Sequence, residues 1–374
     1  MAGIYIHIPF CTQACHYCNF YFVNTLTRKD ELIATIAKEL ISRKDELEDE
    51  EVETIYFGGG TPSLLSQRDL EFLIGIIFHN FSVKSNIEFT FESNPEDLKK
   101  EKIQFLHQLG VNRLSIGVQS FDDDELKAMN RVHNSMEAIY CIEQSLNYIE
   151  NISIDLMFNL PNQTLNSWEK NLMKAISLNP KHISCYNLTI EEKTKLQRLI
   201  KQQIIEKPCE DESVIQFEKT IEMLGTRGFE QYEISNYAQK GFESRHNTNY
   251  WFGAKYLGVG PSAHSFDGQN RRWNLSNLNL YLKNCPSLPY SEIENLSIEN
   301  QYNEFVLTRL RTKWGIPFNE IESRFGPFYA KYIKTQIQNL IDQNLIILNN
   351  EHVILSSKGK LYADSISSQM MYVQ

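Results

Sequence analysis

The sequence predicts an α/β protein: a partial (βα)6 TIM-like barrel followed by a C-terminal α+β domain that resembles a winged helix. Six short apolar runs alternate with amphipathic helical stretches over about the first 190 residues. Such alternation implies parallel strands with right-handed crossovers, and six units leave open a barrel that eight would close. From about residue 297, helical patterns lead into a hairpin. We expect a barrel over 1–190, an aromatic, loop-rich extension over 191–296 and the C-terminal domain over 297–374.

The first predicted strand is an apolar run from Ile4 that leads into a loop with Cys11, Cys15 and Cys18. Thiolates are the usual ligands of iron–sulfur clusters, and three of them can each bind a different iron, which leaves a fourth iron without a protein ligand. A zinc site with His7 or His16 as fourth ligand is an alternative at this point. Disulfides are disfavoured, because the seven cysteines are an odd number and no secretory signal precedes them.

The other five predicted strands follow at regular intervals. Each is a short run rich in β-branched and aromatic residues, and a stretch with helical periodicity precedes it. Gly110 lies just past the third helical stretch, where a glycine in the left-handed conformation commonly ends a helix. The predicted strands cover 52–57, 87–91, 113–118, 152–158 and 182–188, and the predicted helices cover 27–47, 67–81, 95–109, 135–149 and the residues before Pro180.

After the sixth strand the alternation stops. Polar helical segments reach about Gly228, and a loop-rich aromatic stretch continues through Trp273. The last region has helical patterns and then a hairpin with Asn349-Asn350 at its turn. Because the formal net charge is −10, we expect this domain to pack or to dock a partner rather than to read DNA. The helical patterns cover 299–312, 317–325 and 329–343, and the hairpin covers 345–355.

Composition limits the function. Hydrophobic residues make up 42% of the chain, yet no run approaches the roughly twenty apolar residues that span a bilayer. We therefore expect a globular protein without a transmembrane segment. The acidic charge argues against general nucleic-acid binding, and the start of the chain lacks the layout of a secretory signal, which favours the cytoplasm. The oligomeric state stays open.

Glycines and polar residues gather where the predicted strands end. Ligands of parallel α/β barrels bind beyond the C-terminal ends of the strands, so we expect these residues on the same rim as the cysteine loop. Glycine lets backbone amides approach a ligand, although a tight strand-to-helix turn is the ordinary reason for a glycine run. The residues are Gly58, Gly59, Gly60, Thr61, Glu92, Asn94, Gln119 and Ser120.

These motifs resemble a known family. Cys-x3-Cys-x2-Cys after a strand is the signature of the radical S-adenosylmethionine (SAM) enzymes, in which an aromatic residue such as Tyr17 commonly precedes the third cysteine. The run Tyr-Ile-His-Ile-Pro-Phe-Cys narrows the resemblance to the oxygen-independent coproporphyrinogen III oxidase-like family with its HemW-type haem chaperones. The resemblance implies a three-quarter barrel, a [4Fe-4S] cluster on the three cysteines and SAM on the open iron.

The resemblance also implies the SAM contacts. Carboxylates suit ribose hydroxyls, and a guanidinium suits a carboxylate. Some of these positions serve a second SAM in the catalytic relatives. The ordinary alternatives are a solvated helix-end charge for Arg131 and a satisfied buried strand group for Asp155. The implied cofactor-binding residues are Tyr5, Tyr17, Gly59, Gly60, Thr61, Glu92, Gln119, Arg131 and Asp155.

A second motif surrounds His246, which is followed by Asn247 and by Tyr250-Trp251. A lone histidine among aromatic residues is ordinarily a packed core residue. However, His-Asn-x-x-Tyr-Trp resembles the signature of HemW-type haem chaperones. Imidazole is a common axial ligand of haem iron, and aromatic rings offer a flat apolar wall to a porphyrin. We therefore predict non-covalent haem binding at His246, since the sequence has no Cys-x-x-Cys-His.

The expected function is that of a haem chaperone, with a [4Fe-4S] cluster, SAM and haem. It would deliver haem to acceptor proteins such as membrane-associated respiratory enzymes. The alternatives are an oxygen-independent coproporphyrinogen III dehydrogenase and a zinc-stapled interaction protein. Two departures disfavour the dehydrogenase: Phe20 stands where the catalytic relatives have a fourth cysteine, and the signature tyrosine is already residue 5, without their N-terminal extension. No residue is assigned a catalytic role.

Overall fold

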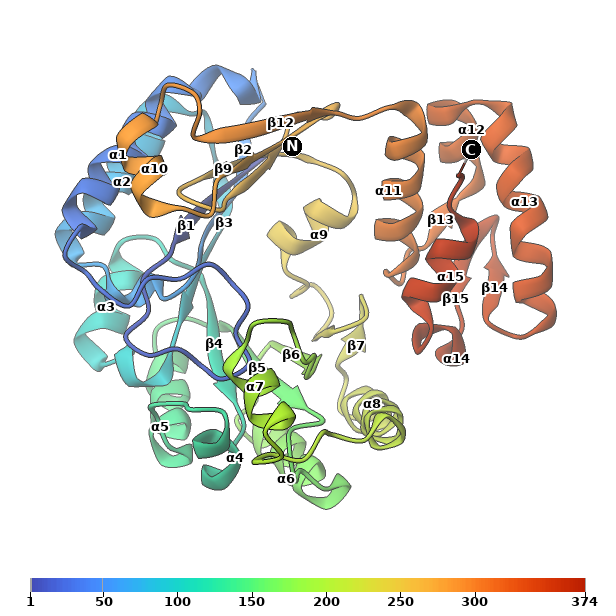
Figure 1. Cartoon of the computed structure of the whole chain (residues 1–374), viewed down its shortest axis with the longest axis horizontal. Helices are drawn as coiled ribbons and strands as arrows, with labels where there is room; N and C mark the ends of the chain where they lie inside the picture. Colours follow the sequence, from blue (N-terminus) through green and yellow to red (C-terminus); the bar gives the residue numbers. More distant parts are fainter. Residues whose placement is uncertain (1, 49, 374) are drawn as a thin grey trace.

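The computed structural model describes residues 2–48 and 50–373. Six neighbouring parallel strands form a curved wall, and helices cover its outer face (Figure 1). This arrangement confirms the predicted partial (βα)6 barrel. The strands are β1 (Ala2–Ile8), β2 (Val52–Gly59), β3 (Val83–Ser93), β4 (Arg113–Gln119), β5 (Asn151–Phe158) and β6 (His182–Asn187). The outer helices are α1 (Lys29–Ser42), α2 (Gln67–Asn80), α3 (Lys100–Gln108), α5 (Ser135–Leu146) and α6 (Leu165–Ser177).

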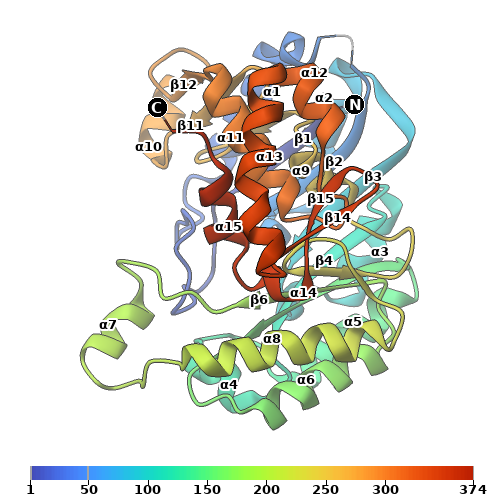
Figure 2. The ribbon, with the colours of Figure 1, turned by 90° about the vertical axis from the view of Figure 1, so that its right-hand side faces the viewer.

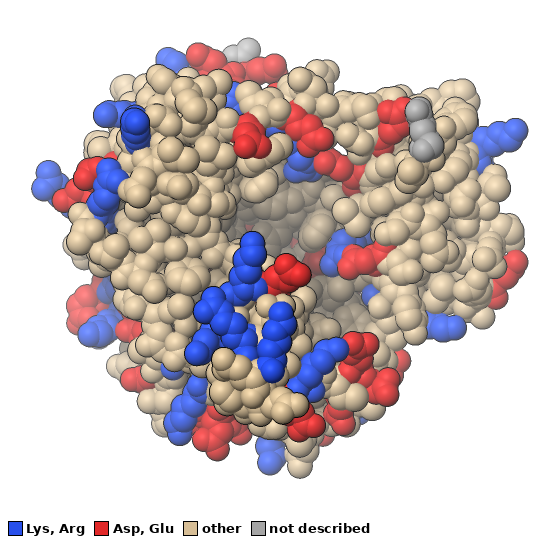
Figure 3. Space-filling view, viewed as in Figure 1, with Lys and Arg blue, Asp and Glu red and all other residues tan. Residues whose placement is uncertain are grey.

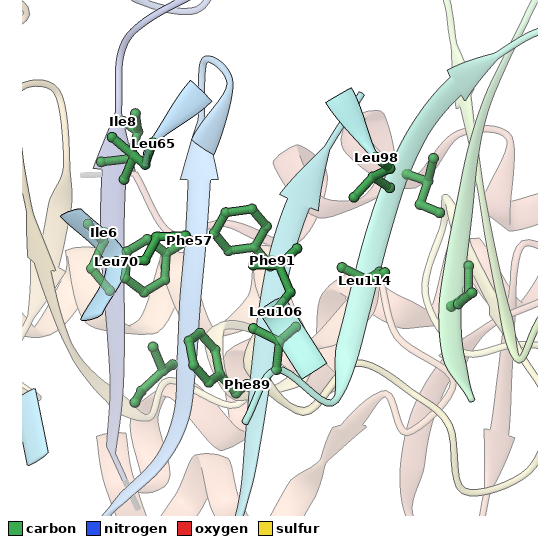
Figure 4. Close-up of a cluster of buried hydrophobic side chains, with 14 of the residues drawn as sticks. Ile6, Ile8, Phe57, Leu65, Leu70, Phe89, Phe91, Leu98, Leu106 and Leu114 are labelled. Carbon is green, nitrogen blue, oxygen red and sulfur yellow. The ribbon is translucent and has the colours of Figure 1, made fainter. Parts of the chain in front are cut away.

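Alternate residues of each strand build two different surfaces, because successive side chains of a strand point to opposite faces. One set is apolar and packs against the helices, as Phe57 and Phe91 do beside Leu70 of α2 and Leu106 of α3 (Figure 4). The other set is mostly polar and faces the concave side of the wall. Its members include Tyr5, His7, Tyr56, Thr90, Glu92, Ser115, Asp155 and Ser184. The barrel thus has an apolar outside under the helices and a polar inside.

Residues 191–296 extend the same sheet at both edges. At one edge β8 (Asn236–Ala238) pairs with β6, and β7 (Glu230–Gln231) pairs with β8. At the other edge β9 (Lys255–Val259) runs parallel to β1. The sequence predicted a loop-rich stretch here; the structure instead has strands that are too short to show a clear period of two. The strands that follow β9 are β10 (His264–Phe266), β11 (Asn270–Asn274) and β12 (Ser291–Asn295), and the helices of this region are α7 (Lys195–Lys201), α8 (Glu210–Gly225), α9 (Arg245–Trp251) and α10 (Leu278–Asn284).

The C-terminal region has its own hydrophobic core, which includes Tyr302, Ile316, Ile333 and Val353. This region faces the concave side of the barrel wall, and α9 lies between the two (Figure 1). In the view of Figure 2 its helices α13 and α15 lie in front of the barrel. The helices and the hairpin confirm the winged-helix-like description. The elements are α11 (Ile298–Leu310), β13 (Ile316–Pro317), α12 (Phe318–Phe325), α13 (Pro327–Asp342), β14 (Ile346–Asn349), β15 (His352–Leu355), α14 (Ser357–Lys360) and α15 (Ala363–Met370).

The hairpin turn differs by one residue from the prediction. Asn349 pairs with His352, so the turn residues are Asn350 and Glu351, with φ of 47° and 63°. A two-residue hairpin turn of this type needs positive φ at both central residues. This register places Ile346 and Val353 in the core, and a shift by one residue would turn them outward.

Candidate functional site

The cysteine loop begins where β1 ends and is fastened at both its base and its tip. At the base, the amide of Val23 donates to the carbonyl of Pro9 at 2.7 Å, and the amide of Cys11 donates to the carbonyl of Val23 at 3.1 Å. At the tip, the side chain of Asn130 donates to the carbonyl of Ala14 at 2.7 Å. The loop is therefore held in one position against the segment that follows β4.

Two polar side chains contact the thiols. Nη1 of Arg131 lies 3.3 Å from Sγ of Cys15, and the Thr61 hydroxyl lies 3.6 Å from Sγ of Cys11. Burial raises the pKa of Cys11, and it raises the pKa of Cys18 to about 11. Thiols that are hard to ionise in the bare protein become thiolates when a metal takes the place of the proton. The positive charge of Arg131 also favours thiolates at this position.

Arg131 is not the solvated helix-end charge that was its ordinary alternative. It follows α4 (Asp123–Ala128), and its Nη2 donates to the side chain of Asn94 and to the carbonyl of Gly117, both at 2.7 Å. Its Nε is buried and has no hydrogen-bond partner among the described residues. The Nε–H is thus an unsatisfied donor beside the cysteine loop.

A cavity of about 460 Å³ lies beside the loop and brings together most of the predicted site. Its volume is in the range of ordinary cofactor pockets. All three cysteines line it, together with the predicted cofactor residues Tyr17, Gly59, Gly60, Thr61, Glu92, Gln119, Arg131 and Asp155. Tyr5 and His246 do not line it. The structure therefore gathers the three cysteines and most of the implied SAM positions at the C-terminal ends of the strands.

The glycine run is tightly packed against the base of the cysteine loop. A Cβ atom at Gly60 would lie 2.7 Å from the carbonyl oxygen of Phe10, and one at Gly59 would lie 2.7 Å from the ring of His7. Gly59 also has a φ of 107°, which side chains rarely allow. Close packing against β1 and the loop is thus one clear reason for the glycines.

Two half-buried carboxyl groups face the cavity from β3 and β5. Glu92 accepts hydrogen bonds from the Tyr56 hydroxyl at 2.6 Å and from the Gly59 amide at 3.2 Å, and burial raises its pKa to about 7. Asp155 accepts from the hydroxyls of Ser115, Ser153 and Ser184 at 2.7–2.9 Å, and burial raises its pKa as well. Both groups are fixed acceptors at the cavity wall.

Gln119 reaches the cavity through an irregularity in the sheet. The pairing of β4 with β5 shifts between Gly117 and Gln119, and Gln119 has a φ of 68°. Bulges of this kind occur next to functional sites and redirect a side chain.

A second cavity of about 860 Å³ adjoins the first and is walled largely by aromatic rings. Asn19, Phe20, Phe22, Glu92 and Tyr186 line both cavities. The remaining wall of the second cavity includes Tyr5, His7, Tyr21, Tyr56, His246, Asn247, Tyr250, Tyr256, Ser262, His264 and Ser276. The two predicted residues that are absent from the first cavity, Tyr5 and His246, thus lie in the wall of the second.

His246 is packed and hydrogen-bonded on both sides of its ring. Its Nδ1 lies 2.7 Å from the Thr54 hydroxyl, and its Nε2 lies 2.6 Å from the Tyr250 hydroxyl. The ring stacks on Tyr56 with 4.9 Å between centroids, and burial lowers its pKa to about 3. In this arrangement His246 is a neutral residue of the cavity wall, and hydroxyl groups occupy both of its ring nitrogens.

Tyr186 and Phe22 line both cavities and were not predicted from the sequence. Asn94, which was predicted on this rim, accepts a hydrogen bond from Arg131. The alternation of apolar and polar residues in β6 marks Tyr186 as inward-facing, so this signal was present in the sequence. Phe22 lies in an irregular loop, for which periodicity gives no information.

All seven cysteines are free. Within the described residues, no three or more His, Cys, Asp or Glu side chains gather closely enough to hold a single metal ion. The two histidines considered for a zinc site are engaged elsewhere: Nδ1 of His16 lies 3.0 Å from the Ala128 carbonyl, and Nδ1 of His7 lies 3.1 Å from the Tyr5 hydroxyl. In residues 2–48 and 50–373 no helix has both the length and the apolar character needed to cross a bilayer.

Comparison with known proteins agrees with this geometry. The radical SAM superfamily matches residues 5–175, and the HemN C-terminal domain matches residues 296–362. A solved structure described as coproporphyrinogen III oxidase (HemN) from Escherichia coli, a radical SAM enzyme, superposes with a TM-score of 0.87 over 99% of this chain and 90% of that one. At 22% identity, this likeness shows the shared fold.

Curated relatives are similar over nearly their whole length. The "Heme chaperone HemW" of Bacillus subtilis is 34% identical over 372 residues, which cover 98% of each chain. The protein of the same name from Haemophilus influenzae is 33% identical, over 97% of this chain and 96% of the relative. The chain therefore belongs to the HemW family of radical SAM proteins.

Proposed function

We propose that this protein is a haem chaperone: it binds haem non-covalently in the aromatic cavity and delivers it to haem-requiring proteins. The single observation that carries the proposal is the aromatic cavity of about 860 Å³ directly beside the cysteine cavity. The family membership of the protein supports the same function, because the relatives that match nearly the whole chain are named heme chaperones.

The cysteine cavity fits a [4Fe-4S] cluster with SAM. Cys11, Cys15 and Cys18 would hold the cluster. The donors around them suit the amino acid part of SAM, because the Arg131 Nε and the Ser93 hydroxyl are buried there without partners among the described residues. When bound, the cluster supplies one open iron position and one-electron chemistry. Glu92 and Asp155 are the acceptors available for hydroxyl groups of SAM.

The aromatic cavity suits a porphyrin as cargo. The faces of aromatic rings can pack against a flat macrocycle, and the polar groups of the same wall can bind its propionates. The cavity volume is within the range of small-molecule sites. Phe20 has 69% of its surface exposed and lines both cavities, so it is free to cover a bound ring. The shared wall brings the cargo close to the cluster site, so that one site can influence occupancy of the other.

The approach to the site carries positive charge although the whole chain is acidic. Figure 3 shows Lys and Arg gathered below the central hollow, where α7 lies in Figure 1. Lys195, Arg198 and Lys201 of α7 are exposed, and the segment just before the helix lines the cysteine cavity. A cluster of positive charge raises the local concentration of an anionic ligand such as a haem with two propionates.

The proposal includes a compartment and acceptors. Seven free cysteines and a cluster with an open iron suit a reducing compartment, so we place the protein in the cytoplasm. The acceptors would be haem proteins, including respiratory enzymes at the membrane.

A haem titration tests the function. Cluster-reconstituted protein, kept anaerobic, should bind haem near one equivalent with a defined Soret band and transfer it to an apo-haem protein. Phe20→Ala should weaken binding, whereas Phe78→Ala should not, since Phe78 is exposed on the outer helix α2. Failure of the wild type to bind haem, or equal weakening by both variants, would contradict the proposal.

A further inference from the structure

Three histidines line the aromatic cavity, and they differ in what their ring nitrogens do. In His7, Nδ1 lies 3.1 Å from the Tyr5 hydroxyl and Nε2 lies 3.5 Å from the Tyr21 carbonyl. In His246, both nitrogens are within 2.7 Å of a hydroxyl. Iron takes an unshared electron pair of an imidazole nitrogen, so each of these rings would have to break an existing contact before binding a metal.

His264 is different. It is exposed, and its ring makes no hydrogen bond or ion pair with any residue in the described part of the chain. Its position is set by the backbone and by stacking: His264 is the first residue of β10, it pairs with Trp273 of β11, and the two rings lie 6.4 Å apart at 27°. The ring is thus placed at the cavity without use of either nitrogen.

The surroundings of His264 suit the polar edge of a porphyrin. The hydroxyls of Ser262 and Ser276 line the same cavity and lie 3.0 Å apart at its exposed side. Hydroxyl groups are donors for a carboxylate such as a propionate. An exposed ligand also suits a carrier, because cargo at the mouth of a cavity can leave without an opening of the core.

We infer that His264 is the axial ligand of the haem iron, and that His246 is a positioning residue. The inference rests on the proposed haem-carrying function. His264 contributes a nitrogen electron pair to the iron, and no proton or electron is exchanged. His246 links β2 to α9 through Thr54 and Tyr250 and so holds the aromatic wall.

The test uses the whole chain with its cluster in place, so that the cysteines are occupied. His264→Ala should lower the affinity for haem and change the Soret band, because the iron loses a ligand. Added imidazole should restore the wild-type spectrum in this variant, because it can fill the position that the side chain has left. His79→Ala is the matched control: His79 is exposed on the outer helix α2.

His246→Gln provides the opposite comparison. It should lower the melting temperature, since it disturbs contacts to Thr54 and Tyr250, while the spectrum of bound haem keeps its histidine signature. An unchanged spectrum and affinity in His264→Ala would overturn the inference, as would imidazole rescue in His246→Gln alone. If the wild type binds no haem, the proposed function fails and the inference falls with it; haem binding with an unaffected His264→Ala defeats the inference alone.

Discussion

Nη1 of Arg131 lies 3.3 Å from Sγ of Cys15, and Nη2 of the same guanidinium donates at 2.7 Å to Asn94 and to the Gly117 carbonyl. One half-buried positive charge thus joins the cysteine loop to the end of β4. Its Nε has no hydrogen-bond partner among the described residues. We expect Arg131 both to bind an anionic group of SAM and to stabilise negative charge on a cluster.

The first prediction concerns this charge. Arg131→Met keeps most of the side-chain length and removes the charge, so the cluster should remain but should have a lower reduction potential, because its reduced form is more negative. SAM affinity should fall as well. A redox titration followed by EPR and calorimetry with SAM measures both effects. In Arg131→Lys, which keeps the charge, the reduction potential of the cluster should lie between those of the Met variant and the wild type. An unchanged potential in the Met variant would contradict this role.

The second prediction concerns the cluster ligands. Changing any one of Cys11, Cys15 or Cys18 to Ala should abolish binding of the four-iron cluster. The same change at Cys209 should have no effect, because Cys209 is exposed and does not line the cavity. Iron and sulfide analysis with the visible spectrum provides the measurement. A full complement of four irons in Cys18→Ala would show that the assignment is wrong.

The third prediction separates packing from ligand contact at the glycine run. Gly60→Ala places a methyl group about 2.7 Å from the Phe10 carbonyl, so it should lower the melting temperature and loosen the base of the cysteine loop. A larger residue such as Val should act more strongly. The matched control is Gly75→Ala in α2, where nothing lies within 4 Å. That change should stabilise the protein by roughly 0.5–1 kcal/mol.

Thermal unfolding and cluster retention after gel filtration measure the two glycine variants. Equal melting temperatures in Gly60→Ala and Gly75→Ala would mean that the close approach to Phe10 does not constrain the loop. SAM affinity measured on the cluster-loaded Gly60→Ala protein then reports any separate effect on the ligand.

The fourth prediction concerns the half-buried carboxyl of Glu92, whose pKa is raised to about 7, mainly because it is desolvated. The folded protein keeps a proton that the unfolded chain loses near pH 4.5. Folding stability therefore falls as pH rises through this window, by at most about 3 kcal/mol from this group. Glu92→Gln has no carboxyl group to titrate and so should not lose stability in this window. The free energy of unfolding of the variant, relative to the wild type, should therefore rise from pH 5 to pH 8.

Urea unfolding of the cluster-free protein at several pH values tests this expectation. Glu101→Gln is the control, because Glu101 is exposed on α3. Parallel stability curves for wild type and Glu92→Gln would contradict the raised pKa.

The barrel was predictable because its signal is local and repeated. In β3, Phe89 and Phe91 alternate with Glu88, Thr90 and Glu92, and the other inner strands show the same pattern. The cysteines and the strand-end residues are close in sequence to those strands, so parallel topology alone predicted the rim that they share. Their presence in one cavity follows from that topology.

Other parts of the site depend on contacts that the sequence does not display. Thr54 and His246 are 192 residues apart, and no local pattern tells that this histidine is bonded at both nitrogens. The strand β9 has only five residues, and it pairs with β1, which lies at the opposite end of the barrel in sequence: Ala2 pairs with Lys255. Such pairings are decided by tertiary packing. The second cavity, and the lack of a hydrogen bond at the His264 ring among the described residues, could therefore be seen only in the structure.

Family membership and the aromatic cavity indicate that this radical SAM protein carries haem rather than oxidising a porphyrinogen. The most direct test is anaerobic incubation of cluster-reconstituted protein with SAM, a reductant and coproporphyrinogen III, run beside a haem titration of the same preparation. The account predicts near-stoichiometric haem binding and no protoporphyrinogen IX. Formation of protoporphyrinogen IX with matching cleavage of SAM would contradict it.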